Sequence, residues 1–146
     1  MKLPERISCM PRPMAPEPDP FTAHFWTALE QRRFEAPRCE SCGLLQFPPR
    51  PVCPACHSDR LHWVPLSGHG QLYTRTRIHA AGGTFSWMTP YSVGVIDLDE
   101  GLRVLTRLLH SASRLSPGSA VQLVVLRHTD GPLFAAIKAA EKENEE

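Results

Sequence analysis

CESCGLLQFPPRPVCPAC, at residues 39–56, contains two Cys-x-x-Cys pairs separated by ten residues. Each pair has the spacing at which one tight turn directs both sulfur atoms toward the same ion. Four thiolates complete a tetrahedron, which suits zinc because zinc is borderline soft and its d electrons impose no geometry. The sequence therefore predicts one zinc ion held in a small ribbon by Cys39, Cys42, Cys53 and Cys56. Iron in a rubredoxin-like site is the alternative with the same ligands.

A metal ion with four protein ligands has no open position for water or substrate, so we expect a structural rather than a catalytic ion. His57 follows the last cysteine and is either a solvated neighbour or a replacement for Cys56 as ligand. The sequence contains no Gly-x-Ser-x-Gly elbow, Walker loop or Gly-x-Gly-x-x-Gly turn, and no two histidines are four residues apart. We therefore predict that the chain is not an enzyme by itself.

Composition and charge narrow the possible partners. The 146 residues suffice for one or two small domains, and a formal net charge of +1 provides no field that steers the chain onto nucleic acid or an anionic membrane. No apolar run reaches the roughly 20 residues that span a bilayer, and the first residues lack the apolar segment of a secretory signal. We therefore expect a soluble, cytoplasmic protein that does not contact membranes. Cys9 lies outside the two pairs, and we expect a free thiol without a role.

Prolines dominate the start of the chain, where six of them remove backbone donors and fix φ within the first twenty residues. We predict a disordered or extended proline-rich arm over residues 1–19. Asp19 and Pro20 then suit a helix N-cap and first helical position, and apolar residues recur at intervals of four. This predicts an N-terminal helix within residues 20–35. Its apolar side chains either pack on their own domain or dock on a partner subunit: Phe21, Phe25, Trp26 and Leu29.

Beyond the zinc ribbon, which we expect over residues 36–65, the sequence changes to short runs rich in β-branched residues, with turn residues between them. Five such strands closed into an OB-type barrel, over residues 66–138, would remove most exposed sheet edges. The predicted strands are Gln71–His79, Ser92–Leu98, Arg103–Leu108, Val121–His128 and Leu133–Lys138. The predicted fold is therefore mainly β: an N-terminal helix, a rubredoxin-like zinc ribbon and a five-stranded OB-fold barrel, followed by a charged tail at 139–146.

The first predicted barrel strand carries residues that suit ligand binding. Tyr73, Arg75 and Arg77 alternate with apolar and threonine side chains, which places them on one face. Arginine forks match phosphate oxygens and an aromatic ring can stack a base, as coenzyme A or single-stranded nucleic acid requires. The other interpretation is a solvated outer face without a ligand.

A long loop follows that strand and ends at the next one. It carries Phe85, Trp87, Met88 and Tyr91, which are residue types enriched at protein interfaces. Loops longer than usual tend to be functional. These side chains either contact a partner or cap the end of the barrel.

The chain also resembles a known family through a combination of short motifs. The likeness extends from about Phe21 to Ile137. The motifs are Phe25-Trp26-x-Ala28-Leu29, Phe34-x4-Cys39-x-x-Cys42-Gly43, Phe47-Pro48-Pro49-Arg50-x-x-Cys53-Pro54-x-Cys56, Trp63, Ser67-Gly68-x-Gly70, Pro90-Tyr91 and Leu98-Asp99-Glu100-Gly101. They resemble the acyl-CoA-associated proteins with a rubredoxin-like zinc ribbon and an OB-fold, long catalogued as a domain of unknown function.

This resemblance implies a non-catalytic subunit that accompanies thiolase-like, lipid-transfer-protein-like or MaoC-like hydratase enzymes, in a hetero-oligomer. It also implies that such a subunit helps to position acyl-CoA, in which case Arg75 and Arg77 would meet the nucleotide end of coenzyme A. The ribbon cysteines match the family pattern without a gap, whereas the proline-rich arm has no counterpart. A single-strand nucleic-acid module is the alternative function, although the near-neutral charge argues against it. A free-standing enzyme that uses the ribbon metal is the third and least favoured.

Overall fold

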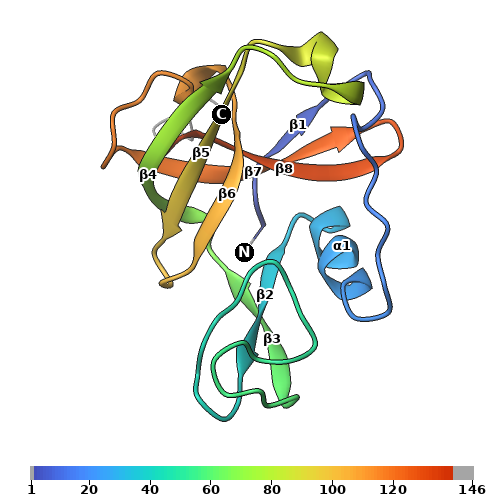
Figure 1. The fold of residues 1–146 in the computed structure, drawn as a ribbon, viewed down its shortest axis with the longest axis vertical. Helices are drawn as coiled ribbons and strands as arrows, with labels where there is room; N and C mark the ends of the chain where they lie inside the picture. Colours follow the sequence, from blue (N-terminus) through green and yellow to red (C-terminus); the bar gives the residue numbers. More distant parts are fainter. Residues whose placement is uncertain (1, 140–146) are drawn as a thin grey trace.

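The computed structural model describes residues 2–139 and shows a barrel above a narrow ribbon (Figure 1). One α-helix, eight strands and two short 3-10 helices make up the described chain. In chain order they are β1 Glu5–Ile7, α1 Ala23–Glu30, β2 Phe34–Cys39, β3 Leu61–Leu66, β4 His69–Ile78, η1 Gly83–Met88, β5 Tyr91–Leu98, β6 Arg103–Leu108, η2 His110–Ala112, β7 Ala120–His128 and β8 Gly131–Lys138. The predicted tail lies outside the described residues, apart from its first residue, Ala139.

Strands β4 to β8 form the barrel. The sheet order is β1-β7-β4-β5-β6-β8, and the additional pairing of β7 with β8 closes it. Each of the five predicted strands begins and ends within two residues of an observed one. The prediction of a mainly β fold with a five-stranded barrel is therefore confirmed.

The barrel interior is built from alternate residues of each strand, as the period of two requires. Along β5, Ser92, Gly94, Ile96 and Leu98 are buried while their neighbours are half-buried. Gly94 is required by packing, because an added Cβ would come within 3.0 Å of the side chains of Leu72 and Leu108. The core is therefore filled so closely that the strands can approach only where one of them carries no side chain.

The N-terminal arm is ordered where it meets the barrel. Strand β1 lies parallel to β7, and the carbonyl of Pro4 accepts a hydrogen bond of 2.9 Å from the amide of Val125. Leu3 is buried in the main core. Of the two predicted alternatives, disordered or extended, this segment is extended, because residues 5–10 contain no proline and Leu3 contributes apolar area to the core.

Helix α1 is shorter than predicted. Asp19 accepts hydrogen bonds from the amides of Phe21 and Thr22 at its side chain, so it caps a turn that precedes the helix rather than the helix itself. The helix ends at Glu30, and Arg32 then adopts a positive φ of 65°. A residue with this left-handed backbone conformation reverses the direction of the chain, so that the helix is followed directly by β2.

The ribbon is joined to the barrel by a shared aromatic cluster. Strands β2 and β3 pair antiparallel from Phe34 with Leu66 to Cys39 with Leu61. Phe47, from the loop between them, packs against Phe25 and Phe34 with ring centroids 5.4 Å apart in both pairs. Phe134 of β8 completes the cluster. The upper end of the ribbon therefore depends on the barrel, whereas the lower end does not.

Candidate functional site

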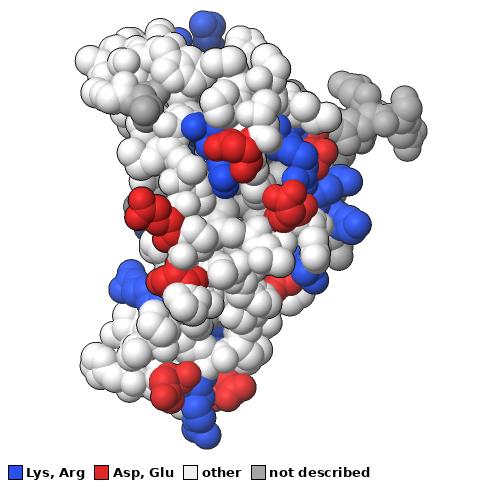
Figure 2. Space-filling model, turned by 90° about the vertical axis from the view of Figure 1, so that its right-hand side faces the viewer, with Lys and Arg blue, Asp and Glu red and all other residues white. Residues whose placement is uncertain are grey.

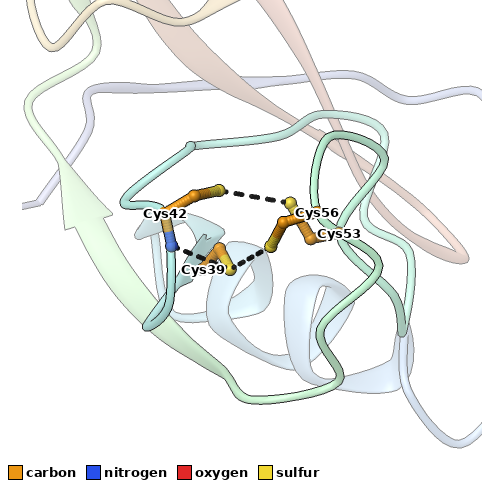
Figure 3. A group of neighbouring side chains, drawn as sticks. All are labelled: Cys39, Cys42, Cys53 and Cys56. Atoms are coloured by element: carbon orange, nitrogen blue, oxygen red, sulfur yellow. Dashed lines mark hydrogen bonds between the residues drawn. The ribbon is translucent and has the colours of Figure 1, made fainter.

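The four predicted ligands converge at the lower end of the ribbon (Figure 3). Their sulfur atoms all lie within 4.8 Å of one another, with 3.5 Å between those of Cys39 and Cys56 and 3.6 Å between those of Cys42 and Cys53. A tetrahedral ion with metal–sulfur bonds of about 2.3 Å separates its ligands by about 3.8 Å. The donor set therefore fits one metal ion of zinc-like size. Within residues 2–139 it is the single group of side chains found in such an arrangement.

Two turns with left-handed backbone hold the cysteines in place. Gly43 has φ of 79° and its amide donates to the carbonyl of Cys39, while His57 has φ of 64° and its amide donates to the carbonyl of Cys53. Both hydrogen bonds measure 2.9 Å. His57 therefore closes the second turn by its backbone, and Cys56 provides the fourth sulfur. The alternative in which His57 replaces Cys56 is not needed.

Backbone donors prepare two of the sulfur atoms as thiolates. The amide of Cys42 lowers the pKa of Cys39 to about 6, and the amide of Cys56 likewise lowers the pKa of Cys53. The amide of Leu44 acts in the same direction on Cys42 and is the largest single influence, but the sulfurs of Cys53, Cys56 and Cys39 together with burial outweigh it and raise the pKa of Cys42 to about 12. The four thiols therefore ionise together only when a cation balances them, which makes metal affinity depend on pH.

The predicted ligand-binding face of the first barrel strand is divided by a β-bulge. The register of β4 against β5 shifts between Leu72 and Thr74, so Arg75 and Arg77 lie opposite Gly94 and Ser92. Residues opposite one another point to the same face of a sheet, and in β5 these two belong to the inward set. The prediction that both arginines share a face with Tyr73 is therefore wrong, because the bulge adds one residue to β4.

The three side chains of that predicted face also have separate partners or positions. The ring of Tyr73 lies under the guanidinium of Arg103, 3.8 Å from its central carbon. The Nε of Arg75 donates a 2.7 Å hydrogen bond to the carbonyl of Leu115. Arg77 lines a pocket beside β5 and β6. The base-stacking and phosphate-binding arrangement that motivated the nucleic-acid alternative is therefore not formed.

The apolar residues of the predicted docking helix are largely used inside the molecule. Phe25 and Leu29 are buried in the main core, with 2% and 0% exposure. Phe21 packs on Trp63 with a centroid distance of 5.2 Å, and Trp26 is half-buried. Docking through Phe25 and Leu29 is therefore wrong, because β2 and β8 already cover this face of the helix. Packing on its own domain was the other interpretation.

The predicted partner-binding loop forms the 3-10 helix η1, and Trp87 on it is 59% exposed. Phe85 of the same element and Trp26 of α1 line one groove of about 640 Å³. Residues 13–17 of the arm and Leu133 of β8 complete it. No sequence pattern predicts that the arm takes part, since residues so far apart along the chain share no local signal.

A histidine–glutamate pair connects α1 to the ribbon. His24 Nε2 lies 2.7 Å from Glu35 Oε1, and the imidazole stacks on Trp63 with ring centroids 4.4 Å apart. Glu35 is 7% exposed and also meets Arg33 at 3.4 Å. These contacts compensate the buried carboxylate, so the pair is structural.

Among the described residues no helix is long and apolar enough to cross a membrane. The predicted cytoplasmic location stays a prediction.

Family models and relatives agree with this architecture. The model for the ChsH2 rubredoxin-like zinc ribbon domain matches residues 26–62, and the model for the ChsH2 C-terminal OB-fold domain matches residues 63–126. The chain is 31% identical over 93 residues to a DUF35 domain-containing scaffold protein of Methanocaldococcus jannaschii. That match covers 62% of this chain and 66% of the relative.

Other relatives are parts of named enzymes. A benzoylsuccinyl-CoA thiolase subunit, BbsA, of Thauera aromatica is 38% identical, over 60% of each chain. A probable enoyl-CoA hydratase alpha subunit of Thermomonospora curvata is 33% identical, over 72% of this chain and 33% of its own length. This chain thus spans between a third and two thirds of the relatives just described. A solved structure described as an Ltp2-ChsH2(DUF35) aldolase superposes with a TM-score of 0.74 at 30% identity, covering 86% of this chain and 99% of the other.

Proposed function

Because the chain belongs to the ChsH2 (DUF35) family of zinc-ribbon and OB-fold proteins, we propose that it is a non-catalytic scaffold subunit of an acyl-CoA enzyme. The partner would be a thiolase-like, lipid-transfer-protein-like or hydratase subunit, in a hetero-oligomer. The observation that carries this proposal is that its relatives include a scaffold protein, a thiolase subunit and a hydratase subunit. The predicted accessory role agrees with those names.

The metal centre supports a structural role. Four sulfur ligands fill the coordination sphere of a tetrahedral ion, so no position is left for substrate or water. We propose that the ion is one zinc, held by Cys39, Cys42, Cys53 and Cys56, and that it orders the lower ribbon. When bound, zinc would supply charge and geometry to four thiolates rather than Lewis-acid chemistry.

The surface charge does not favour the nucleic-acid alternative. On the side shown in Figure 2, Lys and Arg are mixed with Asp and Glu in small charged clusters, and uncharged surface separates one cluster from the next. A protein that follows a nucleic-acid backbone needs a continuous basic groove. With a formal net charge of +1, the chain also lacks an overall attraction to polyanions.

The docking surface that we propose is the groove between α1, η1 and the arm. Trp26, Phe85 and Met14 line it, and Met14 is 65% exposed. Trp87, on the same short helix as Phe85, is 59% exposed. Exposed tryptophan and methionine side chains are enriched in interfaces, where burial of a tryptophan contributes strongly to affinity. Of the eight predicted contact residues, Trp26, Phe85 and Trp87 stay candidates for this surface. The other five are used elsewhere: Phe25 and Leu29 are buried, Phe21 packs on Trp63, and Met88 and Tyr91 line a separate groove.

We also propose that the chain contacts acyl-CoA. Of the predicted face, Arg77 is the member we retain, because it lines a pocket, whereas Tyr73 and Arg75 have intramolecular partners. An arginine fork suits a phosphate or carboxylate group.

Co-purification tests the scaffold proposal. Full-length tagged chain, expressed together with thiolase-fold, lipid-transfer-protein-like and hydratase enzymes from its own genomic neighbourhood, is expected to retain one of them through size-exclusion chromatography. Trp87→Ala should weaken that complex at least about tenfold, since hot-spot tryptophans contribute 2 kcal/mol or more. Tyr73→Ala, which removes an aromatic side chain of 53% exposure outside the groove, is the matched control. A chain that stays alone beside every such enzyme contradicts the proposal.

A further inference from the structure

A small pocket between β4, β5, β6 and η2 carries an unusual concentration of cationic groups. It encloses about 180 Å³ and is lined by Arg77, Tyr91, Ser92, Arg107, His110 and Ser113, with apolar neighbours. Among residues 2–139 no aspartate or glutamate lines it. Within this part of the chain the two guanidinium groups therefore face the pocket without a carboxylate in its wall.

Two polar atoms of this pocket, Nε of Arg107 and Oγ of Ser92, are buried and have no hydrogen-bond partner in the described part of the chain. Ser92 is 3% exposed. A buried donor or acceptor that lacks a partner costs roughly 1–3 kcal/mol, so most such groups in proteins are satisfied. Two residues of one pocket therefore carry polar atoms whose hydrogen-bonding capacity the described chain does not meet.

Arg107 differs from the other well-placed arginines of the barrel. Arg103 and Arg127 form ion pairs with Asp97 and Glu5 at 2.6 and 2.8 Å, and these hydrogen bonds raise their pKa. Burial instead lowers the pKa of Arg107, and among residues 2–139 its side chain has neither an ion pair nor a hydrogen bond. Arg107 is half-buried, and a partly buried cation without a counter-charge is stabilised when an anion joins it.

An apolar groove continues from the pocket. The two share Arg107 and Tyr91, and the groove, of about 410 Å³, is then lined by apolar side chains that include Met88, Val93 and Leu105. A molecule with its charge at Arg107 thus finds apolar surface next to it. Met88 and Tyr91, which the sequence suggested as partner contacts, belong to this groove.

We propose that this pocket binds the oxyanion of a small amphiphile, a phosphate ester or a carboxylate, whose apolar part lies in the adjoining groove. The guanidinium of Arg107 offers a planar fork that matches two oxygens of either group. Arg77 adds a second guanidinium from β4, and the imidazole of His110 lines the same pocket. The site would act in the isolated chain, so it does not depend on the proposed enzyme partner.

Calorimetric titration of the full-length, metal-loaded chain tests the assignment. The probes are hexyl phosphate, hexanoate, inorganic phosphate and, as an uncharged match, hexanol. We expect at least one hexyl anion to bind about tenfold or more tightly than both inorganic phosphate and hexanol. The comparison of hexyl phosphate with hexanoate distinguishes the two oxyanions.

Variants locate the binding. Arg107→Gln should weaken binding of the preferred probe about tenfold or more, as expected for loss of a hydrogen bond to a charged group. Arg77→Gln, which changes an exposed side chain, should weaken it by a similar factor. Arg103→Gln removes the same charge from the same strand but from the Asp97 pair, and should leave binding unchanged. Thermal melting of each variant confirms that it is folded. The proposal is overturned if no hexyl anion binds, if hexanol binds equally well, or if Arg103→Gln weakens binding as much as Arg107→Gln does.

Discussion

Removal of the metal should unfold the lower ribbon and leave the barrel folded. Between Glu40 and Arg60 only Gln46 and Cys53 are buried, while Leu44 and Val52 are exposed at 40% and 44%. The segment therefore has almost no hydrophobic core of its own. Structural zinc in such ribbons binds with an apparent free energy of about 10–16 kcal/mol, which exceeds the stability of many small domains. Without this energy, nothing else in the segment offsets its conformational entropy.

The barrel should lose only the contact that the ribbon makes with it through Phe47. Burial of a phenylalanine side chain contributes about 1.5–3 kcal/mol, and Phe47 is half-buried, so about 2 kcal/mol is expected. For a domain of this size, that loss lowers the melting temperature of the barrel by roughly 8–16 °C. Metal-loaded Phe47→Ala should show a similar decrease without unfolding the ribbon.

Hydrogen exchange before and after chelation separates the two parts. The amides of Gly43 and His57, which donate within the ribbon turns, should lose their protection on chelation. Those of Leu123 and Val125 in β7 should keep most of theirs, since these residues are fully buried in the barrel. Chelation of Phe47→Ala should then cause no further decrease in barrel stability, because the contact is already absent.

Two results would refute this reasoning. Continued protection of the ribbon amides after complete metal removal would mean that the segment has a stability source outside the four sulfurs. Simultaneous loss of protection in Leu123 and Val125 would mean that ribbon and barrel form one cooperative unit. In either case the metal would not be a local folding element.

Three further changes test particular contacts. Gly70→Ala should destabilise the barrel by about 1–3 kcal/mol in thermal melts, because the new Cβ would collide with the carbonyl oxygen of Asp97 and lie 2.9 Å from the Cα of Leu98. Arg127→Met should speed tryptic removal of the N-terminal arm about fivefold, since it breaks the 2.8 Å pair with Glu5, an effect of about 1 kcal/mol. Arg38→Met, which removes the same charge outside the arm, should not produce it. Hydrogen bonds from Arg103 lower the pKa of Asp97, so this pair stabilises the fold above the unfolded aspartate pKa of about 3.9 and ceases to do so as pH falls through the lower folded pKa. The stability difference between wild type and Asp97→Asn in urea should therefore shrink only under acidic conditions; a constant difference would contradict the pairing.

The sequence predicted the metal ligands and the five barrel strands because their signals are local. Thiolate spacing is set within one turn, and the alternation of β5 is visible in eight consecutive residues. The bulge in β4 has no such signal. Residues 73–77 are all exposed, so buried and exposed positions do not alternate along this part of β4. A change of face after Leu72 therefore cannot be recognised from such an alternation. Strand β1 was missed because it has three residues and pairs with β7, a segment far away along the chain.

Burial of the α1 face could not be decided from the helix alone, because an apolar stripe does not reveal which surface covers it. Phe134 of β8 and Phe47 of the ribbon cover Phe25, with centroid distances of 6.1 and 5.4 Å. Both residues are distant in sequence. For the same reason the cationic pocket escaped sequence analysis, since Arg77, Ser92 and Arg107 come from three strands.

The proposed docking groove and the proposed anion pocket are neighbours, but the first would bind a protein partner and the second an oxyanion. The two proposals can therefore be tested separately. Phe85 and Leu133 line both the docking groove and the apolar groove beside Arg107. A partner seated on Trp87 would therefore alter the wall of the ligand groove without touching the cationic pocket. If both proposals hold, the preferred hexyl anion should bind the complex with a different affinity from the free chain, and by linkage it should change partner affinity by the same factor. Arg107→Gln would abolish that coupling while leaving the partner bound, whereas Trp87→Ala would weaken the partner and leave anion binding to the free chain intact.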